Sequence, residues 1–164
     1  MLSKKIETAL NEQLLVEAKS SHAYLAWASW AENEGYPGIA KFMYAHSDEE
    51  RQHMLKLLHY INERGGKAIV PSLEKPEVSI ENITTLFQRL LEHERSVTAS
   101  INEVVGLCLT ERDYSTHNFM QWYVSEQLEE EALATDLLDQ LNLIGNDKSG
   151  MYLFDRDIMT MREG

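Results

Sequence analysis

The sequence is poor in cysteine and in positive charge, and each shortage excludes a class of protein. The single cysteine, Cys108, permits neither an internal disulfide nor a thiolate metal cluster, and it fits a reducing compartment, so we expect a cytoplasmic protein. Lys and Arg number 15 against 27 Asp and Glu, and the resulting net charge of -12 disfavours nucleic-acid binding and favours the attraction of cations. The sequence shows no signal peptide and no membrane span. We therefore expect a soluble protein with neither a nucleic-acid nor a membrane partner.

Proline is scarce as well, and the three prolines are confined to positions 37, 71 and 76. They leave four long stretches in which apolar residues recur at three- and four-residue spacing, which predicts four long helices. The predicted ranges are about 3–33, 38–64, 79–110, with Ser79 as the N-cap, and a last one from the break at 111–114 to about 143. A length of 164 residues suits one domain, covering residues 1–164.

The connection between the second and third predicted helices is long enough to determine the topology. Residues 65–78 could span roughly 46 Å, comparable with the roughly 40 Å of the second helix. The connection can therefore cross the whole bundle, which makes these two helices parallel and gives an all-α four-helix bundle with one long crossover. Residues 148–160 predict a short fifth helix whose apolar face packs against a neighbouring subunit, or alternatively against its own bundle.

Each long helix carries at least one glutamate within its apolar stripe. Burying an ionised carboxylate costs several kcal/mol unless it is compensated, and no Lys or Arg lies in the predicted stripes. Several carboxylates that converge with an imidazole between helices favour bound metal over glutamates exposed beside misjudged stripes. The stripe residues concerned are Glu17, Glu50, His53, Glu94, Glu126 and Glu130.

The ligand types favour iron or manganese over a structural zinc site, because oxygen ligands outnumber a single imidazole. In the predicted topology Glu50 lies between the helices that carry Glu17 and Glu94, so it can bridge two metal ions. Glu17 and His53 would complete the shell of one ion, and Glu94 and Glu130 that of the other. The ion without histidine is then expected to be held more loosely.

These residues resemble those of haem-free bacterial ferritins over nearly the whole chain, from Lys5 to about Met161. The similar segments are 10–17 with Tyr24 beyond it, 49–53, the position of Glu94, and the most specific one, QWYVSEQLEEE at 121–131. The resemblance implies a ferritin-like bundle with a diiron ferroxidase centre whose ligands are Glu17, Glu50, His53, Glu94 and Glu130.

The same resemblance assigns roles to the residues around the diiron ligands. Gln127 would lie beside them, and Tyr24 would be the nearby tyrosine, although a plain buried tyrosine remains an alternative. A third iron site is implied at Glu49, Glu126 and Glu129, with a solvated acidic face as the alternative.

The activity implied by the resemblance is oxidation of Fe(II) by O2 or H2O2 to a bridged ferric pair. The ferric product would then mineralise inside a hollow homo-oligomeric shell of twenty-four subunits. Haem is not expected, because bacterioferritins hold it with a methionine where this sequence has Arg51, whose guanidinium offers no lone pair.

Two other functions stay open from the sequence. A diiron oxidase or peroxidase of the rubrerythrin kind would share the bundle without storing mineral, although the chain has no cysteine-rich module. A helical bundle used only for assembly or partner binding would leave its glutamates exposed and would not handle iron.

Overall fold

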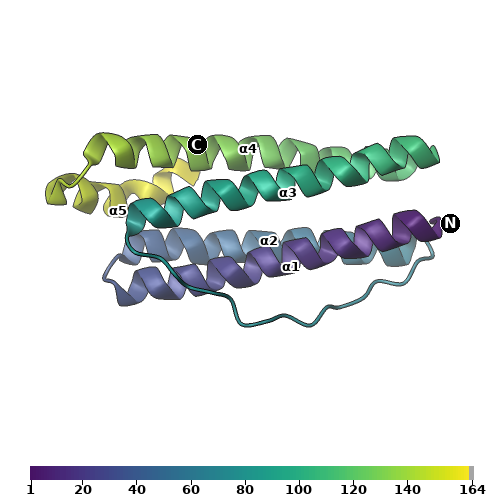
Figure 1. Ribbon diagram of the computed structural model, residues 1–164, viewed down its shortest axis with the longest axis horizontal. Coiled ribbons are helices and arrows are strands. Elements are labelled where there is room, and N and C mark those ends of the chain that lie inside the picture. Colours follow the sequence, from purple (N-terminus) through teal and green to yellow (C-terminus); the bar gives the residue numbers. More distant parts are fainter. Residues whose placement is uncertain (163–164) are drawn as a thin grey trace.

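The computed structural model describes residues 1–162, and five α-helices follow one another along this part of the chain (Figure 1). No strand occurs within residues 1–162, so the all-α prediction is confirmed. None of the helices described is long and apolar enough to cross a membrane. The helices are α1 (Lys4–Asn33), α2 (Pro37–Glu63), α3 (Ile83–Glu111), α4 (Tyr114–Ile144) and α5 (Lys148–Arg162).

The predicted topology is confirmed. Figure 1 shows α1 and α2 running antiparallel, as do α3 and α4, while the connection between α2 and α3 passes along the outside of the bundle and makes those two helices parallel. Asn11 of α1 holds this connection through hydrogen bonds with the backbone of Lys67 and Ile69. The expectation that the helix of Glu50 lies between those of Glu17 and Glu94 is wrong. Helix α1, which carries Glu17, packs closely against both α2 and α3, so α1 lies between the helices that carry Glu50 and Glu94.

The third helix begins later than the sequence predicts, at Ile83 rather than after Ser79. Its N-cap is Asn82, whose side-chain oxygen accepts hydrogen bonds from both the backbone N–H and the hydroxyl of Thr85. Ile80 is buried in the apolar core from an extended stretch before the helix. Both Ser79 and Asn82 are good N-cap residues. Because Ile80 is buried before the helix begins, Asn82 is the N-cap.

The fifth helix packs on its own bundle, which was the alternative expected for its apolar face. Phe154 and Ile158 are buried in the same apolar cluster as residues of α1, α2 and α3. The Asp155 carboxylate accepts hydrogen bonds from the backbone N–H groups of Gly38 and Ile39 in the first turn of α2. The contact is so close that a Cβ atom on Gly38 would lie 1.7 Å from the backbone oxygen of Asp155.

The core consists of two apolar clusters separated by a layer of buried polar side chains. One cluster gathers residues from the second half of α1, the first half of α2, and α5. The other gathers residues from the first half of α1 and the second half of α2. The polar layer lies between them near the middle of the helices, and contains Gln13, Glu17, Ser20, His46, Ser47, Glu50, His53, Glu94, Gln127 and Glu130.

Candidate metal centre

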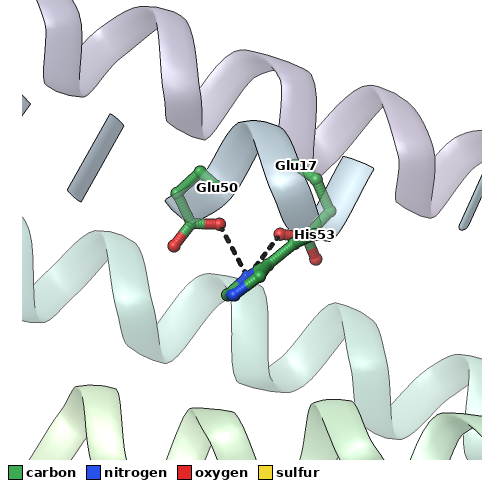
Figure 2. A group of neighbouring side chains, drawn as sticks. All are labelled: Glu17, Glu50 and His53. Carbon is green, nitrogen blue, oxygen red and sulfur yellow. Dashed lines mark ion pairs between the residues drawn. The ribbon is translucent and has the colours of Figure 1, made fainter. Parts of the chain in front are cut away.

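Glu17 of α1 meets Glu50 and His53 of α2 in the polar layer (Figure 2). His53 Nδ1 lies 3.3 Å from Glu50 Oε2 and 3.7 Å from Glu17 Oε2. All three side chains are buried, and one ligand atom from each lies within 4.8 Å of the others. Glu17 Oε2 and both oxygens of Glu50 have no hydrogen-bond partner, so they are free to bind a cation.

A second group with the same spacing combines Glu94 of α3 and Glu130 of α4 with His46 of α2. His46 Nε2 lies 2.6 Å from Glu130 Oε2, but the two atoms are out of line for a hydrogen bond, and both lack any other partner. The structure thus contains two neighbouring groups, each with two carboxylates and one imidazole. Such a pair of sites can hold two cations between the four long helices.

His46 was not among the predicted ligands, although a signal for it is present in the sequence. It lies on the same stripe as Glu50 and His53, four and seven residues before them. Only one imidazole was predicted at the site, whereas the fold brings a second one to Glu94 and Glu130.

Two residues that were predicted to lie near the metal ligands donate hydrogen bonds to different oxygens of the Glu94 carboxylate. The hydroxyl of Tyr24 donates a hydrogen bond to Glu94 Oε1. The amide of Gln127 donates to Glu94 Oε2 at 3.1 Å and also to the backbone oxygen of the same residue. Burial and the neighbouring carboxylates raise the pKa of Tyr24, so this phenol stays a hydrogen-bond donor.

In the first group, the burial of negative charge shifts the pKa values of Glu50 and His53. Burial raises the pKa of Glu50 well above its usual range, and the charges of Glu17 and Glu94 add to the effect, although His53 opposes it. Burial alone would lower the pKa of His53, but the two carboxylates beside it outweigh burial and raise that pKa to about 11. In the absence of metal, a proton on His53 therefore supplies positive charge to this group.

In the second group, the pKa values of the two carboxylates shift in opposite directions. Burial, with the charge of Glu130, raises the pKa of Glu94. Burial also opposes the ionisation of Glu130, but the adjacent imidazole of His46 outweighs it and lowers the Glu130 pKa. One carboxylate of this pair thus holds its charge more readily than the other.

The three residues of the predicted third site lie beside the second group. Glu49, Glu126 and Glu129 line a cavity of about 130 Å³ together with Glu130, and Arg162 of α5 also borders it. Glu49 and Glu126 are half-buried, whereas Glu129 is exposed. The structure brings these carboxylates together, but it also seats a cationic side chain among them.

A surface pocket connects the first group with the outside of the chain. Its volume is about 490 Å³, and His53 and Glu126 form part of its wall next to Trp122 and Lys56. The ammonium of Lys56 lies 4.5 Å from the centre of the Trp122 ring. The pocket offers a path by which a small ion could reach the imidazole of His53.

The sequence comparisons agree with this geometry. The family profile of the ferritin-like domain matches residues 7–144, which include every residue of both groups. The chain belongs to the ferritin family. It is 42% identical over 158 residues to a probable bacterial non-heme ferritin-like protein of Haemophilus influenzae, and the match covers 96% of each chain. It is 41% identical to a bacterial non-heme ferritin of Campylobacter jejuni, over 96% of this chain and 95% of that protein.

Solved ferritin structures share the fold over almost the whole chain. A novel open pore ferritin from the hyperthermophilic archaeon Archaeoglobus fulgidus superimposes with a TM-score of 0.94 at 37% identity, covering 96% of this chain and 97% of that one. A ferritin of Chlorobium tepidum gives a TM-score of 0.87 at 40% identity, with coverages of 97% and 96%. The ferritin-like arrangement of four long helices and a short C-terminal helix is therefore confirmed.

Proposed function

We propose that this protein is an iron-storage ferritin with ferroxidase activity, in which Fe(II) is the substrate of the paired sites. The observation that carries the proposal is the pair of buried ligand groups at the centre of the bundle, with carboxylate oxygens that have no hydrogen-bond partner. An uncompensated buried carboxylate costs free energy, and a bound cation would remove that cost.

In the proposed centre, five residues hold two iron ions. Glu17 and His53 bind the first ion, Glu94 and Glu130 bind the second, and Glu50 bridges them. The charge that Glu94 exerts on the Glu50 carboxylate supports a short separation between the two groups. The metal ions would displace the proton that His53 holds in the metal-free protein.

The proposed reaction takes one electron from each Fe(II). An O2 molecule accepts the two electrons with two protons and becomes H2O2, or H2O2 accepts them with two protons and becomes two water molecules. Hard anionic oxygen ligands stabilise Fe(III) relative to Fe(II), which favours the oxidation. Tyr24 and Gln127 would orient Glu94 for this step, because each donates a hydrogen bond to one of its oxygens.

Storage is the second half of the proposal. The chain would act as a single domain, residues 1–164, that assembles into a cytoplasmic shell of twenty-four copies and deposits ferric mineral inside. The names of the relatives, which include bacterial non-heme ferritins, support storage without haem. Arg51 supports it too, since a guanidinium cannot ligate haem iron. Glu49, Glu126 and Glu129 would supply a third iron site next to the pair.

The proposed activity is tested by adding Fe(II) aerobically to metal-free protein and following the ferric absorbance. We expect a fast phase that consumes about two Fe(II) per chain in the wild type and is lost when Glu50 and His53 are both replaced by Ala. Glu92→Ala is the matched control, because Glu92 is an exposed glutamate on α3. An unchanged fast phase in the double variant would refute the ferroxidase centre.

A further inference from the structure

The side chain of Arg162, in the last turn of α5, lies inside the bundle's acidic edge instead of extending into solvent. Only 12% of this side chain is exposed. One guanidinium nitrogen donates a hydrogen bond to Glu49 Oε1, and the other lies 2.5 Å from His46 Nδ1. Because arginine only donates, His46 Nδ1 is the acceptor of that contact. The guanidinium carbon also lies 5.3 Å from the centre of the Phe42 ring.

The place that Arg162 occupies borders the 130 Å³ cavity of the third carboxylate cluster, which we define as Glu49, Glu126 and Glu129. Glu130 also lines the cavity. Its side chain is only 8% exposed, and its Oε2 has no hydrogen-bond partner. Four carboxylates and a single guanidinium line this cavity, so negative charge exceeds positive charge there and the cavity attracts cations.

We propose that Arg162 is the built-in cation of the third carboxylate cluster, and that it competes with a metal ion for Glu49. The inference rests on the proposed third site and specifies what controls its affinity. A metal ion that binds all three glutamates must displace the guanidinium from Glu49, so the loss of that ion pair weakens metal binding there. The two ions of the central pair do not use Glu49, so they do not compete for that carboxylate, although the same guanidinium also contacts His46 of the second group.

The competition has a reciprocal consequence for the C-terminal helix. If docking of Arg162 lowers the affinity of the cluster for metal, then metal in the cluster must weaken the docking of Arg162 by the same factor. Phe154 and Ile158 would keep the rest of α5 on the bundle, because both are buried in the core. Metal loading of the third cluster should therefore loosen the last turn of α5 and leave the earlier turns in place.

The test is a calorimetric titration of the assembled, metal-free protein with Zn²⁺, which binds carboxylates and imidazoles without redox chemistry. Arg162→Gln removes the competing charge, and we expect it to tighten the weakest class of sites by about tenfold, a larger factor than for the two tightest sites per chain, because only the weakest class uses Glu49. Arg162→Lys keeps a cation and should stay within about threefold of the wild type. Arg156→Gln is the matched control, because Arg156 lies on the same helix but pairs only with Asp157 at the surface.

A second measurement distinguishes competition from a general loosening of the protein. Amide hydrogen exchange in residues 159–162 should quicken in the wild type when Zn²⁺ exceeds two ions per chain, and exchange around Phe154 should not change. In Arg162→Gln these last amides should exchange fast with or without the third ion.

Each outcome decides the question. Suppose that Glu126→Gln abolishes the weakest class of Zn²⁺ sites, which we call the third class. Equal affinity of this class in the wild type and in Arg162→Gln would then overturn the competition and leave the third site intact. The absence of any third class in all variants would overturn both the inference and the third site, whereas the two tight sites would still support the ferroxidase centre. An equal gain in affinity in Arg156→Gln would show a general charge effect and would also overturn the inference.

Discussion

Replacing Glu50 by Gln should make the metal-free protein more stable and its metal binding weaker. The carboxylate of Glu50 is only 1% exposed, and neither of its oxygens has a hydrogen-bond partner. Its pKa is raised well above the usual range by burial, even with His53 beside it, so its surroundings disfavour the charged form on balance. A neutral amide of nearly the same shape removes that penalty.

The size of the effect follows from the cost of an uncompensated buried polar group, about 1–3 kcal/mol in the free energy of unfolding. For a chain of this length, 1 kcal/mol corresponds to a shift in Tm of roughly 2–4 °C. We therefore expect Glu50→Gln to raise the Tm of the metal-free protein by roughly 2–12 °C. The gain should grow as the pH rises above the usual carboxyl range, because a raised carboxyl pKa means that the stability of the wild type falls between the unfolded and the folded pKa.

The assay is differential scanning calorimetry of the wild type and Glu50→Gln in a chelating buffer, repeated after addition of two Zn²⁺ per chain. Zn²⁺ should raise the Tm of the wild type, since a ligand that binds only the folded state stabilises it, and should raise that of the variant much less. Glu92→Gln, on the exposed face of α3, should change neither value. A metal-free variant that is less stable than the wild type would show that the surroundings of Glu50 do not disfavour its charged form.

Three further predictions concern other buried groups. Tyr24→Phe removes the donor to Glu94 Oε1 and should lower the free energy of unfolding of the metal-free protein by about 1–3 kcal/mol in denaturant titrations; an unchanged value would mean that this hydrogen bond is not needed. The pKa of His53, raised to about 11 from about 6.5 when unfolded, gives a stabilisation that is complete below pH 6.5 and is lost as the pH rises towards 11. Zn²⁺ must displace this proton, so calorimetry in buffers of different ionisation enthalpy should detect proton release, and its absence would contradict a charged His53. Cys108 is fully buried with a pKa raised to about 11, so its alkylation at pH 8 should be at least a few hundred-fold slower than in unfolded protein; fast labelling of the folded chain would show that the thiol is accessible.

Most of the fold could be predicted from the sequence because its signals are local. The spacing of apolar residues and the breaks at Gly35 and Gly65 predict the ends of α1 and α2 to within a few residues, and both glycines have a positive φ in the structure. The start of α3 was placed too early because two good N-caps compete there, and the choice depends on burial of Ile80 in the core. The docking of α5 depends on contacts between residues more than 100 positions apart, such as Asp155 with Ile39.

The candidate site was predictable in its glutamates and less so in its other groups. A glutamate such as Glu94 in an apolar stripe is conspicuous, whereas a histidine such as His46 is common in a buried helix and gives a weaker signal. The position of Arg162 could not be predicted at all, because it depends on how α5 folds back on α2 and α4. Interactions that cross between helices need the packing, and the packing is set by the whole core.

The amount of iron retained per chain after aerobic loading shows whether the protein stores ferric mineral. Metal-free protein would be supplied with a large excess of Fe(II) in air, separated from free iron by size-exclusion chromatography, and analysed for iron, protein and particle size. We expect far more than two iron ions per chain in a particle the size of a twenty-four-subunit shell. Iron that stops near two ions per chain in a small oligomer would contradict storage and would identify the protein as a diiron oxidase.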